Sequence, residues 1–353
     1  MTFAARIPLL GFLLSAFLGC TPDPIFDCED KSNIHPICGF HNPEDIAIVE
    51  GGQHLVVTQM GSFMNRDTPG SLALFDLKTE KMRVAYPGSK SSPKSIWGDA
   101  SCPGEMGAAI NPHGIDLAKQ TDGSWRLLVV NHANRESIEF FELVGTGKDL
   151  QLEWRGCSVA PEELFLNDVV NLPDGGFLAT HMLSGWFYWG ILRAGLGLDT
   201  GGVYEWQPNK AWRLVPGTEA PFPNGLEISA NGEDIYLNVG ATDEVRRISR
   251  ATGKRLATGH VVAPDNSAWG KDGRLLVASH TAPHLDKGAC LELEKGACPF
   301  EFEIQALDPK TLQGDVIFSN VGAPMGGATV AVDLGNELVL GSSFGDRIIR
   351  VKR

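Results

Sequence analysis

The chain has 353 residues, of which 43% are hydrophobic and 21% are charged, so it can bury a large core and does not have the composition of a disordered protein. Its formal net charge of −13 argues against the phosphate backbone of a nucleic acid as a partner. The same acidity is compatible with binding of a cation.

The N-terminus resembles an export signal. Arg6 precedes the apolar run "IPLLGFLLSAFLGC", which is too short to span a bilayer. Its "FLGC" end is typical of bacterial lipoprotein signals, so we expect residues 1–19 to be removed and Cys20 to carry lipid. Residues 20–42 would then form a tether, and the protein would be exported and anchored in a membrane, the outer membrane in a Gram-negative host. An ordinary signal peptide with an incidental cysteine is the alternative.

The remaining six cysteines are an even number, which favours disulfides in an exported chain. Two pairs are close in sequence, Cys28 with Cys38 and Cys290 with Cys298, and local bridges are the simplest expectation. No Cys-x-x-Cys spacing indicates a zinc site of the sulfur type.

One pattern recurs six times along the chain. Each copy opens with small or polar residues, continues through a short apolar strand, turns at Gly with Asp, Asn or Gln nearby, and returns through a second apolar strand. The pattern predicts an all-β fold, a six-bladed β-propeller over residues 43–353, with a β-sandwich as the competing architecture. The six hairpins are expected at residues 44–59, 113–132, 167–181, 224–240, 265–280 and 328–343.

The residues that open each hairpin would meet at one mouth of a central tunnel, because the innermost strand of every blade lines the axis. The second strand returns to the same end, where the chain places Gln59, His132, His181 and His280. His113 opens the hairpin that His132 closes, so these two histidines are expected to be close in space.

Oxygen-bearing side chains dominate these openings. Taken one at a time, neighbouring Asn and Asp residues such as these are common in ordinary turns. Their shared position in the repeat strengthens the case for a common site. An all-oxygen set of carboxylates and amides favours Ca²⁺ over transition metals, and four negative charges would balance two such ions. The residues concerned are Glu44, Asp45, Asn167, Asp168, Asn224, Asp265 and Asn266.

The motifs "PEDIAIV", "HGID", "LLVVNH", "LNDVV", "FPNGLEIS", "DNSAW" and "GGATVAVDLGNELVLG" resemble, in order, those of the paraoxonase family of arylesterases and lactonases. The resemblance implies a six-bladed propeller with two calcium ions, one catalytic and one structural. It places His113 and His132 on the family's histidine dyad and His280 near a pocket-wall histidine. It assigns the structural ion to Asp45, Asp168 and the carbonyl of Ile115, and the catalytic ion to Glu44, Asn167, Asn224, Asp265 and Asn266.

Two features depart from the family pattern. Met182 and Leu183 stand where the family often has Asp-His, with His181 just before them, so the carboxylate partner of the dyad is left open. The C-terminal "RIIRVKR" has no cysteine, so the family's disulfide between the two termini cannot form.

Residues 184–202 interrupt the rhythm of the hairpins directly after His181. The aromatic and apolar density of this segment predicts a lid or a pocket wall, with Trp186 and Phe187 beside His181, Met182 and His280 in a substrate pocket. Packing between blades and contact with a membrane are the alternatives.

The function predicted from these features is calcium-assisted hydrolysis of a lactone or ester, a small-molecule substrate. His113 would act as general base on the attacking water, with His132 tuning its proton affinity. No serine-hydrolase elbow competes with this interpretation. A sugar-lactone hydrolase resembling gluconolactonases and a non-catalytic ligand-binding propeller are the alternatives.

Overall fold

The structure is a computed structural model that describes residues 23–62, 68–87, 96–106, 109–282, 290, 293 and 295–353. The signal peptide of residues 1–19 and the lipidation site at Cys20 lie outside these residues. The three disulfides join Cys28 to Cys38, Cys102 to Cys157 and Cys290 to Cys298, which confirms the two local pairings.

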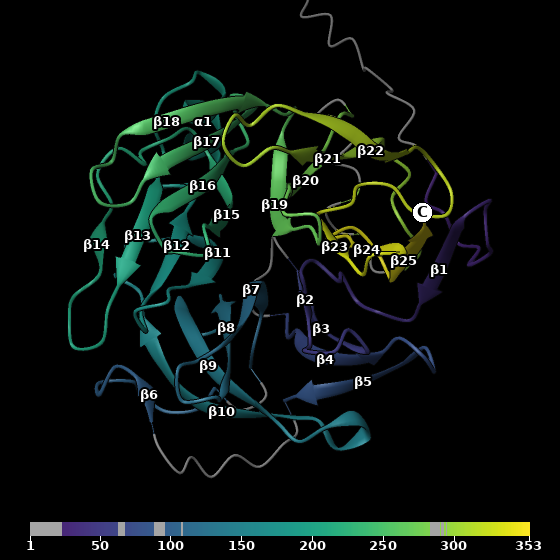
Figure 1. Ribbon diagram of the computed structural model, residues 1–353, viewed down its shortest axis with the longest axis horizontal. Coiled ribbons are helices and arrows are strands. Elements are labelled where there is room, and N and C mark those ends of the chain that lie inside the picture. Colours follow the sequence, from purple (N-terminus) through teal and green to yellow (C-terminus); the bar gives the residue numbers. More distant parts are fainter. Residues whose placement is uncertain are drawn as a thin grey trace, which may run out of the picture.

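Six sheets surround one axis, with strands β2, β7, β11, β15, β19 and β23 innermost (Figure 1). All described strand pairs are antiparallel except β10 with β6, which is parallel. The predicted six-bladed propeller is therefore confirmed. The first three blades consist of β2(Ile46–Ile48), β3(His54–Gln59), β4(Ser71–Asp76) and β5(Lys81–Tyr86); β7(Pro112–Lys119), β8(Trp125–Asn131), β9(Ser137–Val144) and β10(Gln151–Val159), extended by β6(Trp97–Gly98); and β11(Leu166–Asn171), β12(Phe177–His181), β13(Gly202–Trp206) and β14(Arg213–Leu214).

The last three blades complete the ring. They consist of β15(Pro223–Ile228), β16(Asp234–Val239), β17(Glu244–Ser249) and β18(Arg255–His260); β19(Pro264–Trp269), β20(Leu275–Ser279), β21(Phe302–Leu307) and β22(Gly314–Asn320); and β23(Val330–Asp333), β24(Glu337–Gly341), β25(Arg347–Lys352) and β1(Ile34–Cys38). Strand β1 lies within the segment expected to be a tether, yet it pairs antiparallel with β25 over its whole length. The two ends of the described chain thus close the sixth blade, which protects the outer edge of β25.

The turns between the innermost and second strands are short and similar in all six blades. Each contains a glycine with positive φ, between 64° at Gly52 and 96° at Gly335. This left-handed conformation is costly for residues with a Cβ, which explains the glycine in every repeat. The longest connections, among them those from β12 to β13 and from β20 to β21, lie at the other end of the propeller, which we call the mouth.

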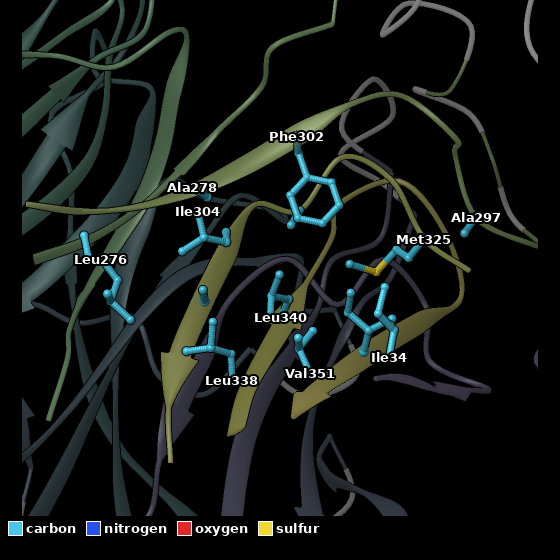
Figure 2. Packing of buried hydrophobic residues seen from close by; sticks show 14 of the residues in the cluster. Ile34, Leu276, Ala278, Ala297, Phe302, Ile304, Met325, Leu338, Leu340 and Val351 are labelled. Atoms are coloured by element: carbon cyan, nitrogen blue, oxygen red, sulfur yellow. The ribbon is translucent and has the colours of Figure 1, made fainter. Parts of the chain in front are cut away.

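The core lies between neighbouring blades rather than within a single sheet. In Figure 2, side chains of β20 and β21, including Leu276 and Phe302, face Leu338 and Leu340 of β24. These side chains are almost completely buried. Because each blade buries apolar surface against two neighbours, closure of the ring contributes to the stability of all six.

The connection from β12 to β13, where the hairpin rhythm is interrupted, contains an α-helix, α1(Phe187–Gly195). A short 3-10 helix, η1(Gly147–Asp149), follows β9. Helix α1 buries Gly190 and Ala194 and exposes large apolar side chains, among them Trp186 at its N-cap and Trp189. In the part of the chain that the structure describes, no helix is both long enough and apolar enough to cross a bilayer.

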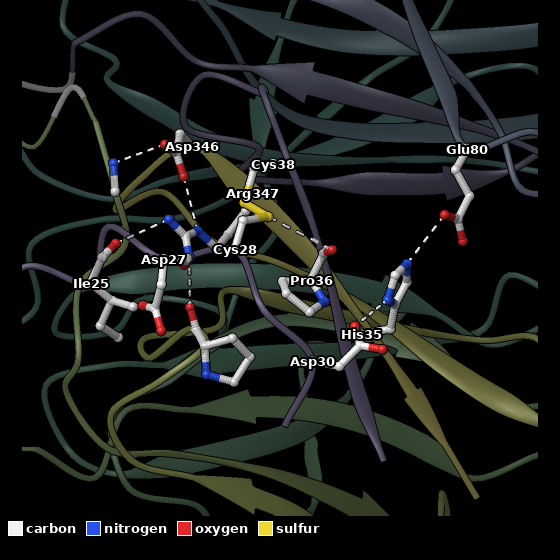
Figure 3. The surroundings of a disulfide bond; sticks show 12 residues. Ile25, Asp27, Cys28, Asp30, His35, Pro36, Cys38, Glu80, Asp346 and Arg347 are labelled. Atoms are coloured by element: carbon white, nitrogen blue, oxygen red, sulfur yellow. Dashed lines mark hydrogen bonds and ion pairs between the residues drawn. A yellow bond between two sulfur atoms is a disulfide. The ribbon is translucent and has the colours of Figure 1, made fainter. Parts of the chain in front are cut away.

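The N-terminal segment is fixed to the propeller by Arg347, the first residue of β25 (Figure 3). The guanidinium is 1% exposed and donates to the carbonyl oxygens of Ile25, at 3.0 Å, Asp27 and Pro324, and to the Asp346 carboxylate at 2.9 Å. One side chain thus satisfies three backbone acceptors from two distant segments.

We expect Arg347→Met to destabilise the protein by about 3 kcal/mol, because buried acceptors left without a donor cost about 1–3 kcal/mol each. Chemical denaturation measures this loss. Lys352→Met on the same strand, where the side chain is exposed, is the matched control and should change the free energy of unfolding little. Equal values for the two variants would contradict the role of Arg347.

Candidate functional site

The residues that open the hairpins lie in interruptions of the β-ladders. In four blades the innermost strand shifts register against its neighbour at one place, and the residues inside the shift are the predicted site residues. A bulge of this kind redirects side chains that a regular ladder would alternate between faces. The skipped pairs are His113–Gly114, Asn167–Asp168, Asn224–Gly225 and Asp265–Asn266.

Glycine at two of these positions allows neighbouring blades to approach closely. A Cβ on Gly114 would lie 2.7 Å from Cα of Asp168, and one on Gly225 would lie 2.6 Å from Cα of Asn266. Both distances are shorter than a carbon–carbon contact allows. The two glycines therefore bring the polar residues of adjacent blades together at the axis.

Several buried oxygens at this mouth accept no hydrogen bond from any residue that the structure describes. They are Oε2 of Glu44 and the Oδ1 atoms of Asn167, Asn224 and Asn266. The amide nitrogens of the same asparagines do have partners: the sulfur of Met182 at 3.9 Å, the carbonyl of Pro264 at 3.3 Å, and Oε1 of Glu44 at 2.6 Å, respectively. Each amide is thus turned so that its nitrogen is satisfied and its oxygen is left available. Buried polar atoms without a partner are rare, and here they belong to the residues predicted to bind a cation.

Asp45 and Asp168 connect blades through backbone amides. Asp45 accepts from Ile46 in its own blade at 2.8 Å and from Ile115 in the next blade at 2.7 Å. Asp168 does the same with Val169 and with Leu226, both at 2.7 Å. Each carboxylate oxygen keeps a further lone pair, so these residues can hold the ring together and still bind a cation.

The carboxylates are strongly affected by burial and by one another. Burial raises the pKa of Glu44 well above its usual value, and the charges of Asp45 and Asp265 raise it further. Burial raises the pKa of Asp45 to about 6, and burial and the charge of Asp45 raise that of Asp168. A positive charge on the axis would remove this penalty.

The two histidines predicted as a dyad are in contact. Nδ1 of His113 lies 3.0 Å from Nε2 of His132, and both rings are buried. Burial, together with the neighbouring His132, lowers the pKa of His113 well below its usual value, so its ring is neutral at physiological pH. Nε2 of His113 lies 3.8 Å from Oε1 of Glu44, which places the dyad beside the oxygen cluster.

Glu136, which no motif in the sequence predicted, is a carboxylate partner for the dyad. Its Oε1 lies 2.9 Å from Nδ1 of His132. The only signal in the sequence is its position four residues after His132, in the loop between β8 and β9. Directly after His181, where the carboxylate partner of the dyad was left open, Met182 contacts the amide of Asn167.

The other predicted pocket residues are spread along the mouth. His280 lies 2.9 Å from the carbonyl of Ala328 and 3.5 Å from Asp265, whereas His181 contacts Ser184 at 2.9 Å. Trp186 is 72% exposed, and Phe187 packs on the ring of Tyr188 with centroids 5.5 Å apart. The assignment of Trp186 and Phe187 to a pocket wall stays a prediction.

A cavity of about 200 Å³ lies on the axis behind the mouth, lined by the innermost strands. Asp45 and Asp168 border it, and Asp116 and Glu227 add two more carboxylates. Burial raises the pKa of both added carboxyl groups. Asp116 accepts from the backbone and side chain of Asn171 at 2.7 and 2.8 Å, so it connects blades two and three.

The donor set at the mouth fits a hard cation. Among the described residues, no group of three or more His, Cys, Asp and Glu side chains is arranged to hold a metal, so a cation there would depend on the amide oxygens as well. Mixed carboxylate and amide oxygens are the ligands that Ca²⁺ prefers. The four oxygens without hydrogen-bond partners satisfy this requirement.

The fold and site define a six-bladed propeller with an acidic axial mouth and a buried histidine pair. A profile of the arylesterase family matches residues 39–349, and the chain belongs to this family. Serum paraoxonase/arylesterase 1 of Rattus norvegicus is 24% identical over 348 residues, covering 94% of this chain and 90% of that protein. The match to serum paraoxonase/arylesterase 1 of Mus musculus is 25% identical and covers 64% of this chain and 59% of that protein. Family membership supports a hydrolase of the esterase or lactonase type.

Solved structures share the fold. A gluconolactonase from Xanthomonas campestris superposes with a TM-score of 0.52 at 14% identity, covering 94% of this chain and 98% of that one. A luciferin-regenerating enzyme gives a TM-score of 0.52 at 14% identity, covering 91% and 95%. At these identities the likeness concerns architecture alone.

We expect Glu44→Gln to stabilise the cation-free protein by about 1 kcal/mol, because it removes a buried charge and supplies an amide donor to oxygens that lack one. Thermal unfolding in the presence of a chelator measures the change. Glu50→Gln, at an exposed carboxylate, is the control. A lower melting temperature for Glu44→Gln than for wild type in chelator would contradict the crowding of charge at the mouth.

Proposed function

We propose that the protein is a calcium-dependent hydrolase of lactones or aryl esters, with a catalytic and a structural ion in the tunnel. The observation that carries the proposal is the set of four buried oxygens that accept no hydrogen bond from the described residues, beside a buried histidine pair. Glu44, Asn167, Asn224, Asp265 and Asn266 would hold the catalytic ion. Asp45, Asp168 and the carbonyl of Ile115 would hold the structural ion.

A calcium ion bound there would supply Lewis-acid stabilisation of the negative charge that develops on the carbonyl oxygen. His113 takes one proton from the attacking water through Nε2 while the water oxygen bonds to the acyl carbon. When the tetrahedral centre collapses, the bond to the leaving oxygen breaks and His113 returns the proton to that oxygen. His132 keeps the ring of His113 in place through the bond to its Nδ1.

We expect turnover of apolar lactones or aryl acetates that a calcium chelator abolishes and added calcium restores. His113→Gln should lower kcat by about 100-fold or more, the usual size of a general-base contribution. Its melting temperature should stay near that of wild type. His260→Gln, on the outer strand β18, is the control and should retain full activity.

The same assay separates the alternatives. Preference for sugar lactones would favour a gluconolactonase-like activity. Calcium-induced stabilisation without turnover of any of these substrates would favour a non-catalytic ligand-binding propeller. Free calcium at 100 times its dissociation constant should raise the free energy of unfolding of the wild type by about 3 kcal/mol, and that of Glu44→Gln by much less.

We further infer that the chain is an exported lipoprotein whose mouth lies close to the membrane. Its three disulfides fit an exported protein. Ile25 pairs with Ala297 in the β20–β21 connection on the mouth side, and it follows Cys20 by five positions, a reach of at most roughly 18 Å. Helix α1, on the same side, exposes Trp186, Trp189 and Leu192. Apolar substrates dissolved in the bilayer would therefore meet the mouth first.

We expect Cys20→Ala to move the protein from the membrane fraction to the soluble fraction and to abolish labelling with radioactive palmitate. Thr21→Ala, which leaves the thiol in place, is the matched control and should stay in the membrane. An unchanged distribution of Cys20→Ala would show that the lipid does not anchor the chain.

A further inference from the structure

Glu136 lies in the loop that follows β8, at the boundary between blades two and three. Its side chain is 9% exposed. Oε1 lies 2.9 Å from Nδ1 of His132 and accepts the backbone N–H of Leu166, the first residue of β11, at 2.7 Å. The ring of Phe165 packs on His132 with centroids 5.2 Å apart. Glu136 is therefore held from a second blade.

This contact determines where the protons of both rings lie. Oε1 of Glu136 already accepts the N–H of Leu166, so it acts as an acceptor toward His132 as well. Nδ1 of His132 then carries the proton and Nε2 of His132 keeps a lone pair. Nδ1 of His113 lies 3.0 Å from that lone pair and must donate to it. In the tautomer that this hydrogen bond selects, Nε2 of His113 carries the lone pair, on the side of Glu44.

We propose that Glu136 is a positioning residue that fixes both histidines in the Nδ1–H tautomer, so that Nε2 of His113 can act as the base. The consequence for turnover depends on the proposed hydrolase function, but the tautomer assignment does not. Glu136 does not touch the substrate; it acts through His132. This role belongs to the loop residue four positions after His132, and not to the residues that follow β12.

Oε1 of Glu136 contacts both His132 and Leu166, so the Glu136→Gln variant separates the loss of the charge from the loss of the acceptor. In Glu136→Gln, the N–H of Leu166 needs an acceptor and turns the amide oxygen toward itself, and the same oxygen then faces His132. This variant should keep both tautomers although it loses the charge. Glu136→Leu removes the acceptor altogether, and His132 is then free to move its proton to Nε2.

The test combines long-range ¹H–¹⁵N spectra of histidine-labelled protein with kinetics. We expect Nδ1–H on both rings in wild type and in Glu136→Gln, and Nε2–H on His132 in Glu136→Leu. The kcat of Glu136→Leu should fall at least about tenfold, the size expected for an outer-sphere partner, with KM nearly unchanged. Glu136→Gln should recover most of that loss. Glu162→Leu, at an exposed glutamate before β11, is the matched control and should behave as wild type.

Two results would overturn the proposal. The first is a wild-type spectrum with the proton of His132 on Nε2. The second is a Glu136→Leu variant that loses activity but keeps wild-type tautomers, which would show that Glu136 acts only by supporting β11. If the wild type hydrolyses none of the substrates, the proposed function fails while the spectra still decide the role of Glu136.

Discussion

The propeller concentrates oxygen-bearing side chains on its axis, and their mutual repulsion has to be compensated for the ring to close. Two carboxylates about 4 Å apart repel by about 4 kcal/mol at an effective dielectric constant near 20. The blades nevertheless bring Glu44, Asp45 and Asp168 together in a buried space, and burial raises the pKa of all three. The fold tolerates this arrangement because backbone amides from the next blade bind two of the three. A cation would neutralise the negative charge that these amide groups do not compensate.

The same constraint explains the local sequence. A regular strand would direct alternate side chains away from the axis, so the register shifts are needed to present two consecutive residues inward. Gly114 and Gly225 follow from the resulting approach of the blades, because a side chain at either place would collide with the backbone of the next blade. The close approach of the blades at the axis thus requires the recurring pairs of Asn, Asp, His and Gly, which also favour turns.

The sequence predicted the parts of the structure that repeat. Six hairpins with period-two apolar strands and a glycine at each tight turn are local patterns, and the six blades follow from them. Strand β1 was not predicted because residues 20–42 resemble a linker, and only pairing with β25, more than 300 positions away, makes it a strand. Glu136 was missed for the same reason. It lies in a loop outside the repeat, and its role depends on Leu166 in another blade.

The two ends of the tunnel have different chemistry, and this difference explains why only the mouth is a candidate for catalysis. Behind Asp45 and Asp168, the cavity adds Asp116 and Glu227, and tight glycine turns close each hairpin at that end. At the mouth, the chain places His113, His132 and the longer connections, including α1. A cation bound among the carboxylates would hold them in the charged form, so they would not take a proton, whereas a neutral imidazole can both take and return one. The histidine pair therefore makes the mouth the end where we expect a proton to be exchanged with water, beside the acidic interior of the tunnel.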